Sequence, residues 1–188
     1  ETSHPRSPIC FYGVSKSAGE VAVEQILRGG FGQYLILRSS WVMGPVGKNF
    51  ARTMLRFHQE KDSFAVVSDQ VSCPTSTFSL SDACWRVIKA GNGLVDSSGR
   101  FPSILHWRDS GVASWYDVSV AIGEIGKELG ILDKSAHVKP ITSAEYPTPA
   151  LRPKYSLLDC SSSQTALGLI PSHWRHSLTE VIRSLLSE

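Results

Sequence analysis

Short apolar runs alternate with helical segments along this chain, and that alternation limits the possible folds more than any other feature of the sequence. Strand-length apolar runs lie at 33–38, 64–67 and 103–107, and helical segments follow them at 49–61, 78–89 and 114–129. The run at 33–38 is apolar at consecutive positions, which is typical of a parallel strand covered on both faces. The sequence therefore predicts an α/β fold.

Further elements lie outside this alternation. We expect a first helix over 12–28, an extended piece at 138–141, a last short strand over 155–159 and a closing amphipathic helix over 174–185. The proline-containing stretch 142–152 is expected to be a loop. The one dense glycine cluster, at 29–32, follows a helix and precedes a strand. That is the wrong order for a phosphate-binding turn, so we interpret the cluster as the end of the first helix.

Composition narrows the class of protein. The net charge of +2 and the absence of a long basic run make nucleic acid an unexpected partner. No apolar run reaches the roughly 18 residues that a membrane span needs, so no membrane partner is expected. The four cysteines have no C-x-x-C spacing, which favours reduced thiols in a cytoplasmic protein over a zinc site or a disulfide framework. They are Cys10, Cys73, Cys84 and Cys160.

Tyr12 and Lys16 form the most informative pair of polar residues. They are four positions apart, so a helix places both side chains on one face. A free tyrosine has a pKa of about 10, and a neighbouring cation brings the phenol closer to the working range of an acid or base. Such a pair can pass a proton to a carbonyl oxygen while a hydride reaches the carbon. The plain alternative is a solvated helix face, because the bare spacing is common.

The residues around this pair favour the catalytic interpretation. Phe11–Glu20, with its small residues between the polar ones, resembles the Y-G-x-S-K-x-x-G-E helix of extended short-chain dehydrogenases/reductases. In that family the Tyr is the general acid, and the Lys binds the nicotinamide ribose and lowers the pKa of the Tyr. A Ser or Thr on an earlier strand completes the catalytic set.

Five further segments resemble the dTDP-4-dehydrorhamnose reductase family within that superfamily. They occur in the family's order, cover nearly the whole chain and are jointly specific. The segments are Arg38–Val42 (R-x-S-W-V), Asn49–Leu55, Val67–Thr75 (the D-Q loop), Ala113–Asp117 (S-W-Y-D) and Glu145–Ser156 (E-Y-P-T-P-A with R-P and Y-S). The chain is thus similar to the C-terminal three-fifths or so of such an enzyme.

This resemblance implies a fold and a division of the chain. The fold is the C-terminal part of a Rossmann-like parallel sheet with its helices, plus a small α/β substrate-binding domain. Residues 1–60 and 78–107 would belong to the Rossmann-like part. Residues 61–77 and 108–188 would belong to the substrate-binding part.

The resemblance also implies an activity, the NAD(P)H-dependent reduction of the 4-keto group of a dTDP-4-dehydro-6-deoxy sugar to dTDP-L-rhamnose. Catalysis would use Tyr12 and Lys16, and cofactor binding would add Arg38 and Ser39. The substrate would contact Trp41, Asn49, Asp69, Gln70 and Arg152.

Several of these residues have plain alternatives. Asp69 and Gln70 can be ordinary turn residues, and Trp41 can be a core aromatic. Arg152 can be solvated, although a fixed guanidinium suits a diphosphate or sugar oxygens. Two other aromatic side chains and one histidine are expected to pack within the protein and not to contact a ligand. They are Trp115, Tyr116 and His106.

The sequence departs from the family pattern in ways that limit these expectations. The Gly-rich dinucleotide turn and the catalytic Ser or Thr are not found in it, so we expect the 188-residue chain alone to bind dinucleotide weakly and to be inactive. Cys73 stands in the D-Q loop, where the family usually has Gly or another residue. Family members are known that use magnesium at a subunit contact, but no ligands for it can be placed here.

Because the strand at 34–37 would leave an edge unpaired, we expect a homodimer or larger assembly, formed through that edge or the first helix.

Two other functions remain open. The regulatory subunit of methionine adenosyltransferase resembles this reductase family and acts as a partner protein, and the intact Tyr12/Lys16 pair fits an enzyme better. A sugar-nucleotide epimerase would keep the enzyme class, but the segment at 145–153 argues against it.

Overall fold

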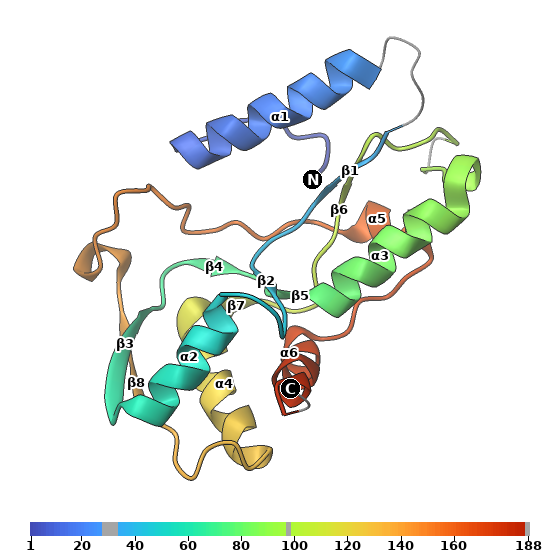
Figure 1. Ribbon diagram of the computed structural model, residues 1–188. Coiled ribbons are helices and arrows are strands. Elements are labelled where there is room, and N and C mark those ends of the chain that lie inside the picture. Colours follow the sequence, from blue (N-terminus) through green and yellow to red (C-terminus); the bar gives the residue numbers. More distant parts are fainter. Residues whose placement is uncertain (28–33, 97–98, 187–188) are drawn as a thin grey trace.

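The computed structural model describes residues 1–27, 34–96 and 99–186 (Figure 1). Six α-helices and eight short strands alternate in the described part of the chain. The helices are α1 (Phe11–Leu27), α2 (Phe50–Glu60), α3 (Thr77–Ala90), α4 (Trp115–Glu128), α5 (Ser161–Leu167) and α6 (Trp174–Ser184). The strands are β1 (Ile36–Arg38), β2 (Val42–Met43), β3 (Ser63–Val67), β4 (Val71–Ser72), β5 (Thr75–Ser76), β6 (Ile104–His106), β7 (Ala113–Ser114) and β8 (His137–Ile141). Two 3₁₀ turns, η1 (Gly91–Gly93) and η2 (Ser143–Glu145), complete the elements.

The strands form four pairs, and three of these are parallel. β1 pairs with β6, β2 with β5 and β3 with β8, whereas the β4–β7 pair is antiparallel. The β1–β6 register places Ile36 opposite Ile104 and Arg38 opposite His106. Each parallel pair joins strands separated by a helix, so the predicted α/β fold with parallel pairing is confirmed.

Most predicted elements are present, but one predicted strand is absent. The segment 155–159 is not a strand, because only an isolated parallel bridge joins Tyr155 to Val71 there. The backbone of Val71 donates to Lys154 and accepts from Ser156, and the extended segment then leaves the ladder. Helix α5 was not predicted, since its first three residues are serines, which are weak helix formers, and Cys160 provides no side-chain cap. The predicted end of the first helix at 28 and the glycine cluster after it lie outside the described residues.

The larger hydrophobic core lies among α2, α4, α6 and the β3–β8 pair. α4 contributes most to it, because its apolar residues recur at helical spacing and face inward. A capping box between Ser114 and Asp117 starts this helix. Its most deeply buried apolar residues are Val118, Ala121, Ile122 and Ile125.

A smaller core lies between α3, α5 and the β1–β6 pair, and includes Ala83, Leu105, Trp107 and Leu167. Packing therefore groups α2 with α4, and α5 with α3. The domain division that the sequence suggested stays a prediction. No described helix is long and apolar enough to cross a membrane.

Helix α1 differs from the other helices. It lies at one end of the molecule, with α4 and α6 at the other (Figure 1). None of its 17 residues is buried, although it carries several apolar side chains. Its position therefore depends little on the two hydrophobic cores.

Candidate active site

Tyr12 and Lys16 share one face of α1, as their spacing predicted. The Lys16 ammonium lies 5.4 Å from the centre of the Tyr12 ring. The Tyr12 side chain is 69% exposed, so its hydroxyl is accessible to a ligand. The backbone carbonyl of Tyr12 accepts a hydrogen bond from the Ser15 hydroxyl one turn further on.

A cavity of about 410 Å³ brings Tyr12 together with three other residues that the sequence indicated. Trp41 follows β1, Gln70 lies between β3 and β4, and Arg152 belongs to the proline-containing loop. These residues are up to 140 positions apart in the chain and meet only in the folded structure. Cys10 and Trp115 also line this cavity, although no sequence motif pointed to them as ligand contacts.

The backbone and the ring of Trp41 are both held in a defined conformation. Its φ of 45° is the one positive value among the described non-glycine residues. The ring stacks on Trp115 with 3.6 Å between ring centres and 14° between planes. Two hydrogen bonds from Thr75 hold the backbone here. Its amide donates to the Trp41 carbonyl at 3.2 Å, and its hydroxyl donates to the Ser40 carbonyl at 2.6 Å. A strained backbone held by many contacts is typical of a ligand-binding position.

Trp115 combines the packing that we predicted with a second role. It contacts Phe50 as well as Trp41, with 4.5 Å between the Phe50 and Trp115 ring centres. It is the first residue of α4 and lies between the two capping-box residues, Ser114 and Asp117. The ring faces both the Tyr12 cavity and a second cavity.

This second cavity has a volume of about 800 Å³ and adjoins the first. Gln70, Trp115 and Arg152 line both. The additional walls are mainly aromatic and aliphatic and include Phe50 and Phe57. Within the described residues, the Arg152 guanidinium makes no hydrogen bond or ion pair, so it can contact a ligand at the junction of the two cavities.

Asp69 and Gln70 already hold a loop in place. One Asp69 carboxylate oxygen accepts hydrogen bonds from the Ser143 amide at 2.8 Å and from its hydroxyl at 2.7 Å. The Gln70 amide donates to the same hydroxyl at 3.0 Å. The hydrogen bonds from Ser143, led by its hydroxyl, lower the pKa of Asp69. These contacts fix η2 beside the larger cavity, and substrate contact by Asp69 stays a prediction.

Asn49 is the N-cap residue of α2, and both polar atoms of its side-chain amide form hydrogen bonds. Its oxygen accepts from the Arg52 backbone amide at 3.2 Å, and its nitrogen donates to the Gly44 carbonyl at 2.7 Å. This capping explains why a helix starts at Phe50. Contact with substrate stays a prediction for this residue.

Arg38, at the end of β1, is paired with α1. Its guanidinium donates two hydrogen bonds to the Glu20 carboxylate, at 2.7 and 2.6 Å. These bonds from Arg38 are the main cause that lowers the pKa of Glu20 to about 2, against the opposing effect of burial. The adjacent Ser39 hydroxyl is buried without a hydrogen-bond partner among the described atoms. The predicted cofactor contacts of Arg38 and Ser39 remain predictions.

Two buried residues are structural. His106 lies in the core as predicted, with Nδ1 at 3.1 Å from the Asp159 carbonyl oxygen and a pKa that burial lowers. The Cys73 thiol donates to the Asp109 carbonyl at 3.0 Å, and burial raises its pKa to about 12. It is therefore an inert thiol. Within the part of the chain that the structure describes, no group of three or more His, Cys, Asp or Glu residues is placed to hold a metal ion.

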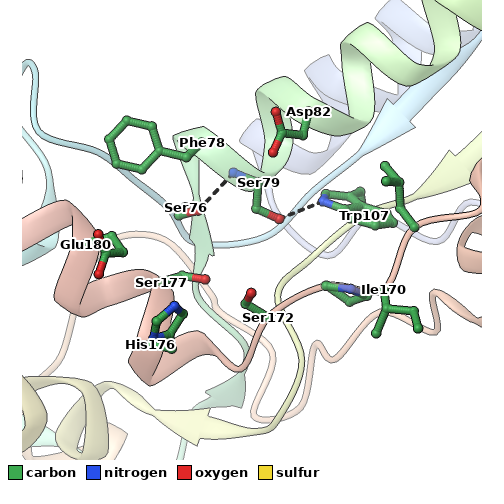
Figure 2. A pocket seen from close by; sticks show the side chains of 12 residues that line it. Ser76, Phe78, Ser79, Asp82, Trp107, Ile170, Ser172, His176, Ser177 and Glu180 are labelled. Carbon is green, nitrogen blue, oxygen red and sulfur yellow. Dashed lines mark hydrogen bonds between the residues drawn. The ribbon is translucent and has the colours of Figure 1, made fainter.

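Figure 2 shows a third cavity, of about 210 Å³, between the start of α3 and α6. The Trp107 indole donates to the Ser79 hydroxyl at 2.9 Å, and the Ser76 hydroxyl accepts from the Ser79 amide at 3.0 Å. The carboxylates of Asp82 and Glu180 stand on the two helices. None of the residues that the sequence indicated lines this cavity, so we place the active site elsewhere.

The chain is similar to known proteins over nearly its whole length. The profile of the RmlD substrate binding domain matches residues 1–187. A dTDP-4-dehydrorhamnose reductase of Sinorhizobium fredii is 36% identical over 181 residues, which is 96% of this chain and 58% of that protein. A dTDP-4-dehydrorhamnose reductase of Streptomyces griseus is 37% identical over 97% of this chain and 56% of that protein. The chain thus spans less than two thirds of the length of these relatives.

Solved structures show the same similarity. A dTDP-4-dehydrorhamnose reductase of Bacillus anthracis in complex with NADP has a TM-score of 0.80 and 28% identity, covering 97% of this chain and 58% of that one. An orthologue from Clostridium acetobutylicum has a TM-score of 0.78 and 34% identity, covering 98% and 57%. A UDP-glucuronic acid 4-epimerase of Bacillus cereus, at 18% identity and a TM-score of 0.69, covers 96% of this chain and 53% of that one, and shares the fold alone.

Proposed function

Because the chain belongs to the family of RmlD substrate binding domains, we propose that it is the substrate-binding and acid-supplying part of an NAD(P)H-dependent reductase. The substrate is a dTDP-4-dehydro-6-deoxy sugar, and the product is dTDP-L-rhamnose. The observation that carries this proposal is the cavity in which Tyr12 lies with Trp41, Gln70 and Arg152. It combines a phenol beside an ammonium group with an aromatic wall and a guanidinium.

Tyr12 acts as the general acid. The nicotinamide, when bound, supplies hydride to C4 of the sugar, and the Tyr12 phenol gives its proton to the O4 oxygen. Lys16 lies on the same helix face, so its positive charge stands beside the phenol that gives up the proton. Lys16 is also the residue here that would hold the nicotinamide ribose.

The two adjoining cavities match the two parts of a nucleotide sugar. The keto sugar lies in the Tyr12 cavity against the Trp41 ring, and the nucleoside lies in the larger cavity beside Phe50 and Phe57. Arg152 lines both cavities, so it contacts the diphosphate between them. Aromatic walls favour a planar base and the apolar face of a deoxy sugar.

The assembly and location of the protein are part of this proposal. The cofactor is NADPH or NADH, and most phosphate contacts come from a Gly-rich turn that these residues do not contain, so the 188-residue chain alone binds it weakly and is inactive. β1 has one described neighbour, β6, and the free side of β1 and the exposed α1 favour a homodimer or larger assembly in the cytoplasm. Light scattering after size exclusion measures the assembly.

Tyr12→Phe tests the reaction in the protein as its gene encodes it. Loss of a general acid costs about 10²- to 10⁴-fold, so kcat should fall by that factor while the nucleotide sugar still binds. Tyr155→Phe is the matched control, because that exposed tyrosine lines none of the three cavities. Near-normal turnover of Tyr12→Phe would remove Tyr12 from the mechanism.

Product analysis by NMR separates the other functions. A reductase yields the 4-hydroxy sugar with one nicotinamide oxidised for each product molecule, whereas an epimerase consumes no net nicotinamide. A protein without turnover that captures a methionine adenosyltransferase would instead be a regulatory subunit.

A further inference from the structure

Helix α1 carries a polar stripe at four-residue spacing, made of Tyr12, Lys16, Glu20 and Glu24. Residues four apart lie above one another on a helix, so these side chains share one face. At one end of the stripe, Tyr12 enters the cavity. At the other end, both carboxylates are held by arginines.

Glu20 is the centre of this charge cluster. Arg38 on β1 donates two hydrogen bonds to its carboxylate, at 2.7 and 2.6 Å, and Arg6 donates a third at 2.6 Å. Arg6 also pairs with Glu24, so the segment before the helix is tied to the helix itself. The Glu20 and Arg38 side chains are only 17% and 22% exposed. Bidentate geometry and a network are the conditions under which an ion pair near the surface contributes measurably.

Within the described residues, the other ion pairs of α1 are those of Glu20 and Glu24 with Arg6, which precedes the helix in the chain. The helix buries none of its residues, and the Glu20–Arg38 pair is the ion pair that joins it to a strand within the described residues. The rotation of α1 about its own axis therefore depends on this pair.

We infer that Glu20 is a positioning residue, which sets the rotation of α1 through Arg38 and thereby the place of the Tyr12 hydroxyl in the cavity. The inference rests on the proposed reductase function. It gives the Arg38 guanidinium a task separate from the cofactor contact that the sequence suggested.

The required precision follows from helix geometry. Eight residues separate Tyr12 from Glu20, which is about 12 Å along the axis. A rotation of about 10° moves a group roughly 6 Å from the axis by about 1 Å. A displacement of about 1 Å can cost on the order of 10²-fold in rate. Releasing Glu20 should therefore lower the rate of the chemical step.

Glu20→Gln and Glu24→Gln form a matched pair of variants, in the protein as its gene encodes it. Both remove one carboxylate from the same helix face, but only Glu20→Gln removes the contact with Arg38. Glu20→Gln should lower kcat about 10- to 100-fold and leave KM for the nucleotide sugar within about threefold. Glu24→Gln should keep kcat within about threefold of wild type. Glu20→Asp, which keeps the charge, should recover part of the loss.

A merely structural role gives a different result. Both variants would then lower Tm, and kcat of the folded protein at saturating substrate would stay unchanged. An unchanged kcat in Glu20→Gln overturns the inference.

A distance measurement makes the test independent of activity. Nitroxide labels at Gln25→Cys on α1 and Lys127→Cys on α4 report the placement of α1 by pulsed EPR. The distance distribution should shift or broaden in Glu20→Gln and stay unchanged in Glu24→Gln, and identical distributions would overturn the inference. If wild-type protein lacks reductase activity, the proposed function fails while this measurement still decides the positioning role. Two accessible cysteines are replaced by serine beforehand, namely Cys10 and Cys84.

Discussion

Gly123, in the middle of α4, faces the buried side chain of His58 on α2. A Cβ at position 123 would lie 2.5 Å from His58 Cε1, 2.9 Å from Nε2 and 3.0 Å from Nδ1. The imidazole cannot simply move away, because both nitrogens are engaged. Nε2 lies 2.9 Å from the Ser119 carbonyl oxygen, and Nδ1 accepts the Ala136 amide at 3.1 Å. We therefore expect Gly123→Ala to destabilise the protein.

The magnitude follows from three contributions. Overpacking in a filled core costs about 1–3 kcal/mol. Displacing His58 leaves a buried donor or acceptor unpaired, which costs about 1–3 kcal/mol. The better helix propensity of Ala over Gly returns about 1 kcal/mol. The free energy of unfolding should thus fall by about 1–5 kcal/mol.

Urea denaturation followed by circular dichroism measures this change. Gly126→Ala, one turn along the same helix, is the matched control. There the Cβ would meet the Leu132 Cδ1 atom at 2.6 Å, which is the end of a flexible side chain, so a smaller loss is expected. A Gly123→Ala protein within 0.5 kcal/mol of wild type would refute the reasoning, with 0.5 kcal/mol taken as about the usual limit of neutral substitutions.

Two further predictions concern protonation and thiol chemistry. Burial lowers the pKa of His58 below its usual 6.5, so the unfolded state binds the proton more readily, and the free energy of unfolding should fall as pH drops below about 6.5, by at most about 1.4 kcal/mol per pH unit from this group. A pH series of urea melts measures it, and a flat profile between pH 7 and 5 would contradict it. Cys84 and the half-buried Cys10 should react with a thiol reagent in the native protein, whereas Cys73 and Cys160 should react only on unfolding, because burial raises the pKa of both. Mass spectrometry after timed quenching locates the labels, and fast native labelling of Cys73 would overturn this assignment.

Local sequence signals predicted the elements that depend on local interactions. The helix starting at Trp115 carries its own capping box, and its core face follows from apolar residues at helical spacing. The segment 155–159 also had strand-like residues, but a strand needs a partner over several residues. Val71 offers a single bridge there, and this partner is 84 positions away from Tyr155 in the chain. A local sequence pattern cannot predict how many residues will pair with such a distant partner.

In the candidate site, too, the sequence identified residues but not the contacts that form only on folding. Family motifs singled out Tyr12, Trp41, Gln70 and Arg152, and the fold places all four in one cavity. They did not reveal that Trp115 joins them, because its stacking partner is distant in the chain. For Asp69, Asn49 and Arg38, the family resemblance implied ligand contact, yet each side chain already has a partner in the fold. Those partners are Ser143, Gly44 with the Arg52 amide, and Glu20.

The charge cluster on α1 and the buried His58 respond to acid at different pH. The pKa of Glu20 is lowered to about 2 by Arg38, so its contribution to stability is present above the ordinary carboxyl range near 4.5 and is lost only as pH falls toward 2. His58 loses its contribution from about 6.5 downward, because its folded-state pKa lies below that value. Between these two ranges the core that joins α2 to α4 weakens while α1 stays attached to β1. Mild acid should therefore loosen the wall formed by Phe50 and Phe57 before it displaces Tyr12, so nucleotide-sugar affinity should decline at a higher pH than the one at which the acid-supplying helix is released.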